Sequence, residues 1–248
     1  MKFSLFHFFF IFPIICIFSF SAKAQWQLDV ESGAVWNGYN DVRVPNDATL
    51  FSLSENDPGA NPFFRVELLY TIKNRHTIRA LYAPLQISSI GSFGSEVTFN
   101  ETTFDAGTLC QATYVFNSYR LTYRYNFLTK GKFRWGLGIT GKIRDAKIEV
   151  IGDNKRARTT DLGFVPLINF YAEWFPAEKL SVLLVGDALA VPGSPGRAED
   201  VLLALRFHID DRISFKAGYR ILEGGADVDQ VYNFSLFHYA VAGVFVNF

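Results

Sequence analysis

The stretch SYRLTYRYNF, residues 118–127, alternates strictly between polar and apolar side chains. Because successive side chains of a β-strand point to opposite faces, this period of two predicts a strand with one charged and one apolar face. In water the apolar face would form a core. In a membrane it would contact lipid, and the charged face would line a lumen. The alternation alone fits both environments.

The same alternation recurs along the chain, and ten segments are predicted as strands. They span residues 26–36, 62–72, 76–88, 112–128, 132–151, 160–175, 179–190, 198–209, 212–221 and 234–248. The connections alternate in length: 73–75, 129–131, 176–178 and 210–211 are tight turns, whereas 37–61, 89–111, 152–159, 191–197 and 222–233 are longer. Short turns on one side and long loops on the other are typical of a transmembrane barrel. We therefore predict an all-β fold, a closed up-and-down antiparallel transmembrane β-barrel of about ten strands, with eight as the alternative.

The two ends of the chain predict export. Lys2 precedes a mostly apolar run over 5–20 and the small residues Ala22 and Ala24, which together predict a signal peptide over 1–24 with cleavage before Gln25. Residues 25–248 then form a single barrel domain. The chain closes on VFVNF, and its terminal Phe248 resembles the signature by which the outer-membrane assembly machinery recognises its substrates. We expect a monomer in the bacterial outer membrane, in contact with lipid and lipopolysaccharide.

Charge and cysteine content exclude several classes of protein. The chain carries 24 basic and 24 acidic residues, and removal of the signal peptide takes away Lys2 and Lys23. The mature chain therefore lacks the excess of basic residues that is typical of a nucleic-acid-binding protein. Only Cys110 remains after processing, which excludes an internal disulfide. No cysteine or histidine spacing indicates a metal site, and no cofactor is predicted.

The alternation also assigns charged residues to the lumen. Ten of the fourteen residues so assigned are basic: Asp29, Glu31, Arg65, Glu67, Arg79, Arg120, Arg124, Arg134, Lys142, Arg144, Glu173, Arg206, Lys216 and Arg220. One interpretation is a salt-bridged plug, because lumen charges must pair or be hydrated. The other is an anion-attracting lining.

Residues predicted near the outer mouth are the candidates for a site. As ligand-binding residues we take Arg120, Lys142, Arg144, Asp187, Arg220 and Glu223. Segment 144–149 is expected to stand above the membrane, with a bulge between Arg144 and Asp145 where the alternation slips. His238 and Asp227 are the candidate catalytic pair, although His238 shares its face with Phe248 and lacks a neighbouring serine in a His-x-Ser arrangement.

The overall plan resembles the outer-membrane β-barrel superfamily, which includes the OmpA membrane domain and OmpW-like barrels. Locally, GYRILEGGAD at 218–227, VYNF at 231–234 and DVRVP at 41–45 look like segments of uncharacterised bacterial barrel proteins. The resemblance implies the fold and the location and no activity. We expect a structural or binding barrel, or one for restricted passage of small or anionic molecules. The alternatives are an outer-membrane hydrolase or lipid A-modifying enzyme with a site at the outer rim, and a soluble periplasmic β-protein.

Overall fold

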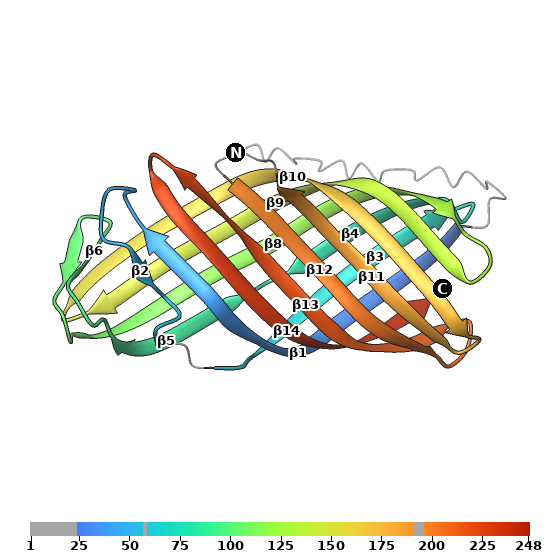
Figure 1. The fold of residues 1–248 in the computed structure, drawn as a ribbon, viewed down its shortest axis with the longest axis horizontal. Coiled ribbons are helices and arrows are strands. Elements are labelled where there is room, and N and C mark those ends of the chain that lie inside the picture. The colour runs from blue at the N-terminus through green and yellow to red at the C-terminus, as the bar shows by residue number, and fades with distance from the viewer. Residues whose placement is uncertain (1–23, 57–58, 191–195) are drawn as a thin grey trace, which may run out of the picture.

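The computed structural model describes residues 24–56, 59–190 and 196–248 (Figure 1). The predicted signal peptide lies outside these residues except for Ala24, so the peptide and its cleavage site stay predictions. No helix among the described residues is long and apolar enough to cross a membrane. The strands are β1 (Ala24–Arg43), β2 (Phe51–Ser52), β3 (Asn61–Ile72), β4 (His76–Ala83), β5 (Gln86–Ser92), β6 (Val97–Phe99), β7 (Thr102–Phe104), β8 (Leu109–Leu128), β9 (Phe133–Gly152), β10 (Lys155–Ala177), β11 (Leu180–Ala190), β12 (Gly196–His208), β13 (Ile213–Val228) and β14 (Val231–Asn247).

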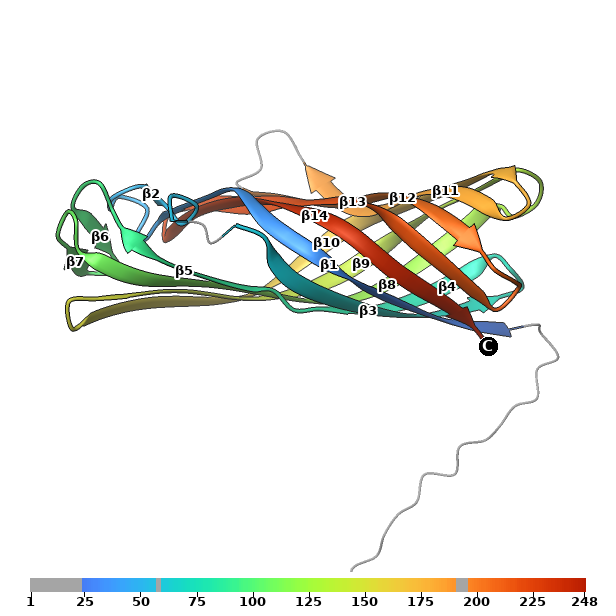
Figure 2. The ribbon, with the colours of Figure 1, turned by 90° about the horizontal axis from the view of Figure 1, so that it is seen from below.

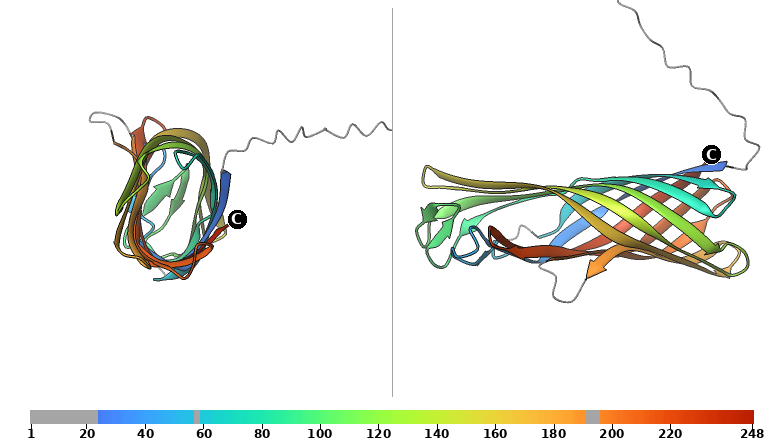
Figure 3. Two further views of the ribbon diagram at one scale, coloured as in Figure 1. Left: turned by 90° about the vertical axis from the view of Figure 1, so that its right-hand side faces the viewer. Right: turned by 90° about the horizontal axis from the view of Figure 1, so that it is seen from above.

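The long strands close into a barrel. Each strand pairs antiparallel with the next in the order β1, β3, β4, β8, β9, β10, β11, β12, β13, β14, and β14 pairs with β1 to complete the ring. β5 follows β4 and pairs with the same neighbour, β8, so the two share one of the ten positions in the ring. Viewed end-on, the ribbon forms a closed oval (Figure 3). The predicted closed antiparallel barrel of about ten strands is confirmed.

The two ends of the barrel differ as predicted. The tight turns that follow β3, β8, β10 and β12 lie at the end where β14 terminates, which we call the inner end (Figure 1). The predicted long connections 152–159 and 222–233, however, are wrong, because the strands continue through them. β9 and β10 are joined by Asp153 and Asn154 alone, with φ of 49° and 57°. Positive φ at both central residues suits the twist of a two-residue hairpin.

The predicted bulge between Arg144 and Asp145 is also wrong. Strand β9 keeps an unbroken register with both β8 and β10 across this point. The chemistry of the inward face changes instead, because Lys142 and Arg144 are followed on the same face by Ile148 and Val150, which are buried. When inward-facing residues change from charged to apolar, the polar–apolar alternation of the sequence changes phase, as it also does at a bulge.

That apolar lining contacts a cap at the outer end. β2 and the β6–β7 hairpin lie beside the extended β8–β10 sheet (Figure 2), and Phe99 and Phe104 of the hairpin are at most 1 % exposed. They belong to one hydrophobic cluster with Phe51, Val150 and Ala157. The outer end of the barrel is therefore filled by its own long connections.

The wall of the barrel has its charges inside and its apolar side chains outside. On β8, Arg120 and Arg124 are buried, whereas Leu121 is 63 % exposed. The same holds around the ring, with Ile139 and Leu205 exposed by 69 % and 57 %. Soluble monomers rarely expose large contiguous apolar patches to water. We call these outward side chains the apolar band.

Aromatic rings border the apolar band at both ends. Near the inner end, Trp26 packs on Tyr70 with ring centroids 4.6 Å apart, and Trp135 and Trp174 pack on neighbouring phenylalanines. Trp36 lies at the opposite border beside Tyr219. On β9, eleven residues from Phe133 to Ile143 span the band between these borders, the length that crosses a bilayer. The four tryptophans therefore lie where interfacial girdles are expected.

A glycine is required where the ring closes. Gly33 of β1 has φ of +143°, and a Cβ there would lie 2.1 Å from the backbone oxygen of Ala240 on β14. We expect Gly33→Ala to lower the free energy of unfolding by about 1–3 kcal/mol, the cost of comparable backbone strain. Urea unfolding in lipid vesicles measures this. Gly94→Ala is the matched control, since its Cβ would meet nothing within 4 Å, and equal losses in both variants would contradict the explanation.

Candidate functional site

Asp200 of β12 lies at the centre of the lumen, among three arginines from three other strands. Its carboxylate oxygens lie 3.0 Å from Arg65 Nη2, 2.7 Å from Arg120 Nη2 and 2.5 Å from Arg220 Nη1. All four side chains are buried. Each arginine points inward because it occupies the polar face of an alternating strand.

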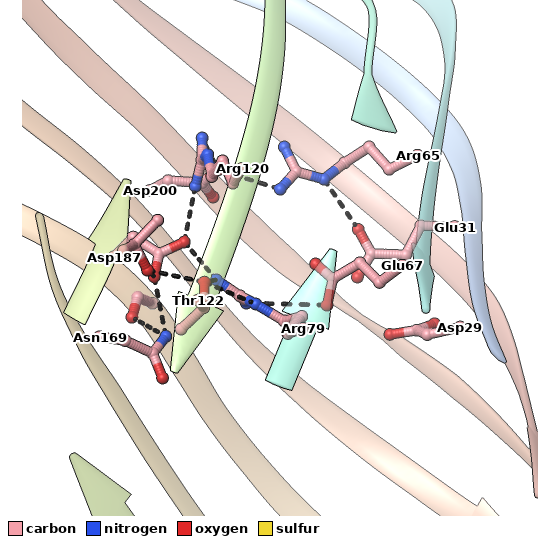
Figure 4. A network of polar contacts seen from close by, with 12 residues as sticks. Asp29, Glu31, Arg65, Glu67, Arg79, Arg120, Thr122, Asn169, Asp187 and Asp200 are labelled. Carbon is pink, nitrogen blue, oxygen red and sulfur yellow. Dashed lines mark hydrogen bonds and ion pairs between the residues drawn. The ribbon is translucent and has the colours of Figure 1, made fainter. Parts of the chain in front are cut away.

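Asp187 of β11 forms the second centre of this network (Figure 4). Arg79 Nη2 and Arg120 Nη1 lie 2.5 and 2.8 Å from its Oδ2 atom. Its other oxygen accepts hydrogen bonds of 2.8 Å from Thr140 Oγ1 and Asn169 Nδ2. Arg120 therefore joins the two aspartates.

Glu31 of β1 extends the network to the seam of the barrel. Lys216 Nζ donates to Glu31 and to Asp29, at 2.5 Å each, and Arg220 lies 2.7 Å from Glu31. Removal of one partner from such a buried network leaves an uncompensated charge, so its members depend on one another. We call this set the charge layer: Asp29, Glu31, Arg65, Glu67, Arg79, Arg120, Asp187, Asp200, Lys216 and Arg220.

The charge layer lies between two cavities. The cavity on the outer side has a volume of about 350 Å³ and the one on the inner side about 670 Å³. Within the described residues, no side chain lines both. Several members of the charge layer, including Asp29, Glu31 and Arg79, form the wall of the inner cavity.

The outer cavity combines apolar walls with a buried cation. Its apolar lining includes Tyr114, Phe116 and Leu222. Lys142 of β9 is 3 % exposed, and its ammonium lies 4.6 Å from the centroid of the Phe116 ring. No carboxylate in the described part of the chain lies within 4 Å of it. Arg144 lies two residues further on the same face and contacts Asp161.

The six ligand-binding candidates therefore fall into two groups. Arg120, Asp187 and Arg220 belong to the charge layer, where protein partners occupy them. Lys142, Arg144 and Glu223 line the outer cavity. Glu223 is held by Arg197, 2.8 Å away, and accepts a hydrogen bond from Tyr39. Burial, together with the Glu223 hydrogen bond, raises the pKa of Tyr39 above its usual value.

The two catalytic candidates do not lie together. His238 is on the outer surface of the wall, where its ring lies 5.9 Å from those of Trp36 and Tyr219. Asp227 is exposed near the tip of β13 and accepts a hydrogen bond from Asn46. Asp227 pairs across the ladder with residue 232, six positions from His238, a separation of roughly 20 Å. This arrangement gives no shared site.

A serine, a histidine and a glutamate do meet at the inner end. Ser181 Oγ lies 2.7 Å from Glu173 Oε1 and 2.9 Å from His208 Nε2. The carboxylate accepts the single hydroxyl proton of Ser181, so the imidazole is not placed to remove it. Ser181 is also fully buried. We interpret this group as structural. In the described segments, no group of three or more His, Cys, Asp or Glu is arranged to hold a metal ion.

Sequence reasoning missed Asp200 as a lumen residue. The signal was present, because Asp200 lies six positions before Arg206, which was assigned to the lumen, and shares its face. It also missed Asn169, which is fully buried and donates to Asp187. Alternation identifies the face of a residue, but it does not identify the partner across the lumen.

Comparisons with known proteins bear on the fold. No family model matches the chain, and no curated protein sequence matches it. Among solved structures, the outer membrane protease OmpT from Escherichia coli superposes with a TM-score of 0.55 at 10 % identity, covering 93 % of this chain and 99 % of that one. The attachment invasion locus protein Ail of Yersinia pestis, in complex with the heparin analogue sucrose octasulfate, gives 0.39 at 11 % identity over 90 % and 99 %. Neisserial surface protein A gives 0.34 at 15 % identity over 91 % and 97 %.

The similarity to the protease establishes a shared fold and no shared activity at this level of identity. The chain thus has the architecture of outer-membrane β-barrel proteins. A specific likeness to OmpA or OmpW, and the local motif at 218–227, stay predictions.

Proposed function

We propose that this chain is an outer-membrane barrel with a sealed lumen that binds a small anionic molecule, apolar in part, in its outer cavity. The observation that carries the proposal is Lys142, a buried cation with no carboxylate partner among the described residues, which lines an apolar cavity beside Arg144. A buried charge without an opposite charge costs free energy, and the Phe116 ring supplies a cation–π contact and no counter-ion. A bound anion would supply that counter-ion, and a cavity of this size whose lining surface is mostly apolar is typical of small-molecule sites.

The arrangement of the wall supports the proposed location. Outward apolar side chains bordered by aromatic rings suit a lipid bilayer, and the predicted signal peptide supplies the route of export. Lipid and lipopolysaccharide would then contact the apolar band and its outer border. Assembly by the outer-membrane machinery through the strand that ends at Phe248 belongs to the same proposal.

The charge layer favours binding over free passage. Its ion pairs cross the lumen between β1, β3, β4, β8, β11, β12 and β13, and the cavities on its two sides share no lining residue within the described segments. We expect no ion conductance when the purified protein is reconstituted in a planar bilayer. Steady conductance steps of an open pore would contradict the sealed lumen. An enzyme at the rim has no comparable support, because the two candidate catalytic residues, His238 and Asp227, are separated by roughly 20 Å along the strand.

Substitution of Lys142 tests the binding site directly. We expect Lys142→Met to weaken binding of the probe naphthalene-1-sulfonate about tenfold or more, the loss of one charge-assisted contact. Titration calorimetry on protein in lipid nanodiscs measures this. The stability of the barrel should not fall, since the substitution removes an unpaired charge.

Two controls define the outcome. Lys130→Met changes an exposed lysine in the β8–β9 turn at the inner end and should leave the affinity unchanged. Neutral 1-naphthalenemethanol should bind wild type and Lys142→Met equally. The proposal is wrong if naphthalene-1-sulfonate does not bind the wild-type protein, or if it binds wild type and Lys142→Met with equal affinity.

A further inference from the structure

Strand β10 has one free edge at the outer end of the barrel. It pairs with β9 from Lys155 to Trp174, but its pairing with β11 begins only at Ile168. Over 155–167, no strand of the described chain pairs with its other side. The views agree that β11 and β12 end well short of the β9–β10 hairpin (Figures 1 and 2).

Two observations identify which backbone groups face this edge. Pro166 has no N–H group to give to β9, and the carbonyl of Arg158 accepts a hydrogen bond from the Asn100 side chain and not from a strand. In an antiparallel pair, alternate residues direct their N–H and C=O groups to opposite sides. The backbone groups of Thr160, Leu162 and Phe164 therefore face the open edge.

Both faces of this edge strand are distinctive. Leu162 and Phe164 point outward and are 75 % and 71 % exposed, among the most exposed apolar side chains described. Thr159, Asp161 and Val165 line the outer cavity. A strand added here would send every second side chain into that cavity.

An unpaired edge at this height is costly. Phe164 is in register with Ile143, at the outer border of the apolar band. Backbone N–H and C=O groups near lipid need partners, because lipid offers no hydrogen bonds. Natural proteins usually cover or block an open edge of this kind.

The charges near the edge favour an acidic partner. Between Lys142 and Asp161 the chain carries six basic and four acidic residues. Glu149 is already engaged, since hydrogen bonds from Arg156 lower its pKa below the usual value. Arg158, like Lys142, has no carboxylate within 4 Å among the described residues.

We propose that the free edge of β10 binds an extended acidic peptide as an added strand. Its backbone pairs with Thr160, Leu162 and Phe164, and one of its carboxylates enters the outer cavity toward Lys142. The backbone pairing stands on the strand geometry alone, whereas the carboxylate contact rests on the proposed anion site. Main-chain hydrogen bonds give affinity in this mode of recognition, and alternate side chains give specificity.

A second copy of the chain does not fit this edge. Two barrels in one membrane share their orientation, so a two-fold axis that relates them lies along the membrane normal. Edge-to-edge pairing would then join the inner face of one wall to the outer face of the other. The apolar side chains Leu162 and Phe164 of one copy would then lie on the same side of the joined sheet as the charged, cavity-lining face of the other copy.

The probe is a blocked six-residue peptide of alternating glutamate and valine, titrated against the full barrel in lipid nanodiscs. We expect it to bind wild type, and a lysine–valine peptide to bind at least tenfold more weakly. Two further peptides carry N-methyl groups on every valine or on every glutamate. One of them should lose affinity about tenfold and the other should keep it, because only one set of amides faces β10.

Substitution of the protein edge gives the matching test. Thr160→Pro removes one edge-facing donor without touching the β9 ladder, and should weaken the peptide about 2- to 10-fold. Thr160→Val keeps the donor and should not change the affinity. Binding of naphthalene-1-sulfonate should be the same in all three proteins.

The outcomes separate this inference from the proposed function. If naphthalene-1-sulfonate binds and the peptide does not, strand addition is wrong and the anion site stands. Equal tolerance of both N-methylated peptides overturns backbone pairing even if Thr160→Pro fails to fold. If Lys142→Met no longer binds naphthalene-1-sulfonate but binds the peptide as tightly as wild type does, the carboxylate contact with Lys142 is wrong.

Discussion

Replacement of Asp200 by alanine is expected to lower the free energy of unfolding by about 3–5 kcal/mol, the usual cost of breaking a buried ion pair from one side. Asp200 lies within 3.0 Å of Arg65, Arg120 and Arg220. Its removal leaves three buried guanidinium groups in place of a neutralised cluster. Arg120 keeps Asp187 and Arg220 keeps Glu31, so the charge layer is weakened at its centre and not abolished.

Urea unfolding of the barrel in lipid vesicles measures the effect. Asp211→Ala, in the exposed β12–β13 turn, is the control and should stay within about 0.5 kcal/mol of wild type. Adding Arg220→Met to Asp200→Ala removes one of the three guanidinium groups that lose Asp200 and should restore part of the loss, because Glu31 keeps Lys216 as its partner. If Asp200→Ala is as stable as wild type, the charge layer does not stabilise the lumen.

The fold could be predicted because alternation and turn length are local signals. Residues 118–127 identified the two faces of β8, and the tight turns at 73–75 and 210–211 identified the inner end. The predicted connections at 152–159 and 222–233 failed because β9, β10, β13 and β14 continue beyond the membrane as paired strands. These segments contain Gly152, Asp153, Glu223, Gly224 and Gly225, so their composition resembles that of a loop.

The site could be predicted only in part. Lys142 and Arg144 were placed at the outer mouth by alternation and strand direction, and they line one cavity. Arg120, Asp187 and Arg220 were placed equally well, but they are occupied by one another and by Asp200. The pairs Arg120–Asp187 and Arg220–Glu31 join residues 67 and 189 positions apart, and no local pattern encodes such contacts.

The change from a charged to an apolar lining over residues 144–150 of β9 also depends on contacts with distant residues. Ile148 and Val150 share the inward face of Lys142 and Arg144, and apolar residues fit there because Phe99 and Phe104 of the cap lie in the same buried cluster. The sequence around β9 contains no sign of that cap. The alternation therefore predicted a bulge between Arg144 and Asp145, whereas the strand continues there and only the packing partner of its inward face changes.

Leu121→Arg is expected to lower the free energy of unfolding in lipid vesicles by about 2–4 kcal/mol, the cost of an arginine on the lipid side of a barrel near the bilayer midplane. Leu121 lies on the outward face of β8, in register with Gly141 within the stretch of β9 that spans the apolar band, and is 63 % exposed. In a soluble β-protein the same substitution would place a charge in water and change the stability by no more than about 0.5 kcal/mol. The two environments that alternation alone cannot separate thus predict different results.

Leu109→Arg is the matched control on the same strand. Leu109 is 70 % exposed and lies at the outer end of β8, in register with Ser92, beyond the apolar band. It should tolerate arginine in either environment. A loss confined to Leu121→Arg places the apolar band in lipid, because two leucines of similar exposure on one strand then differ only in depth. Equal tolerance at both positions would contradict membrane insertion and favour the soluble periplasmic alternative, since exposure to water alone does not distinguish the two sites.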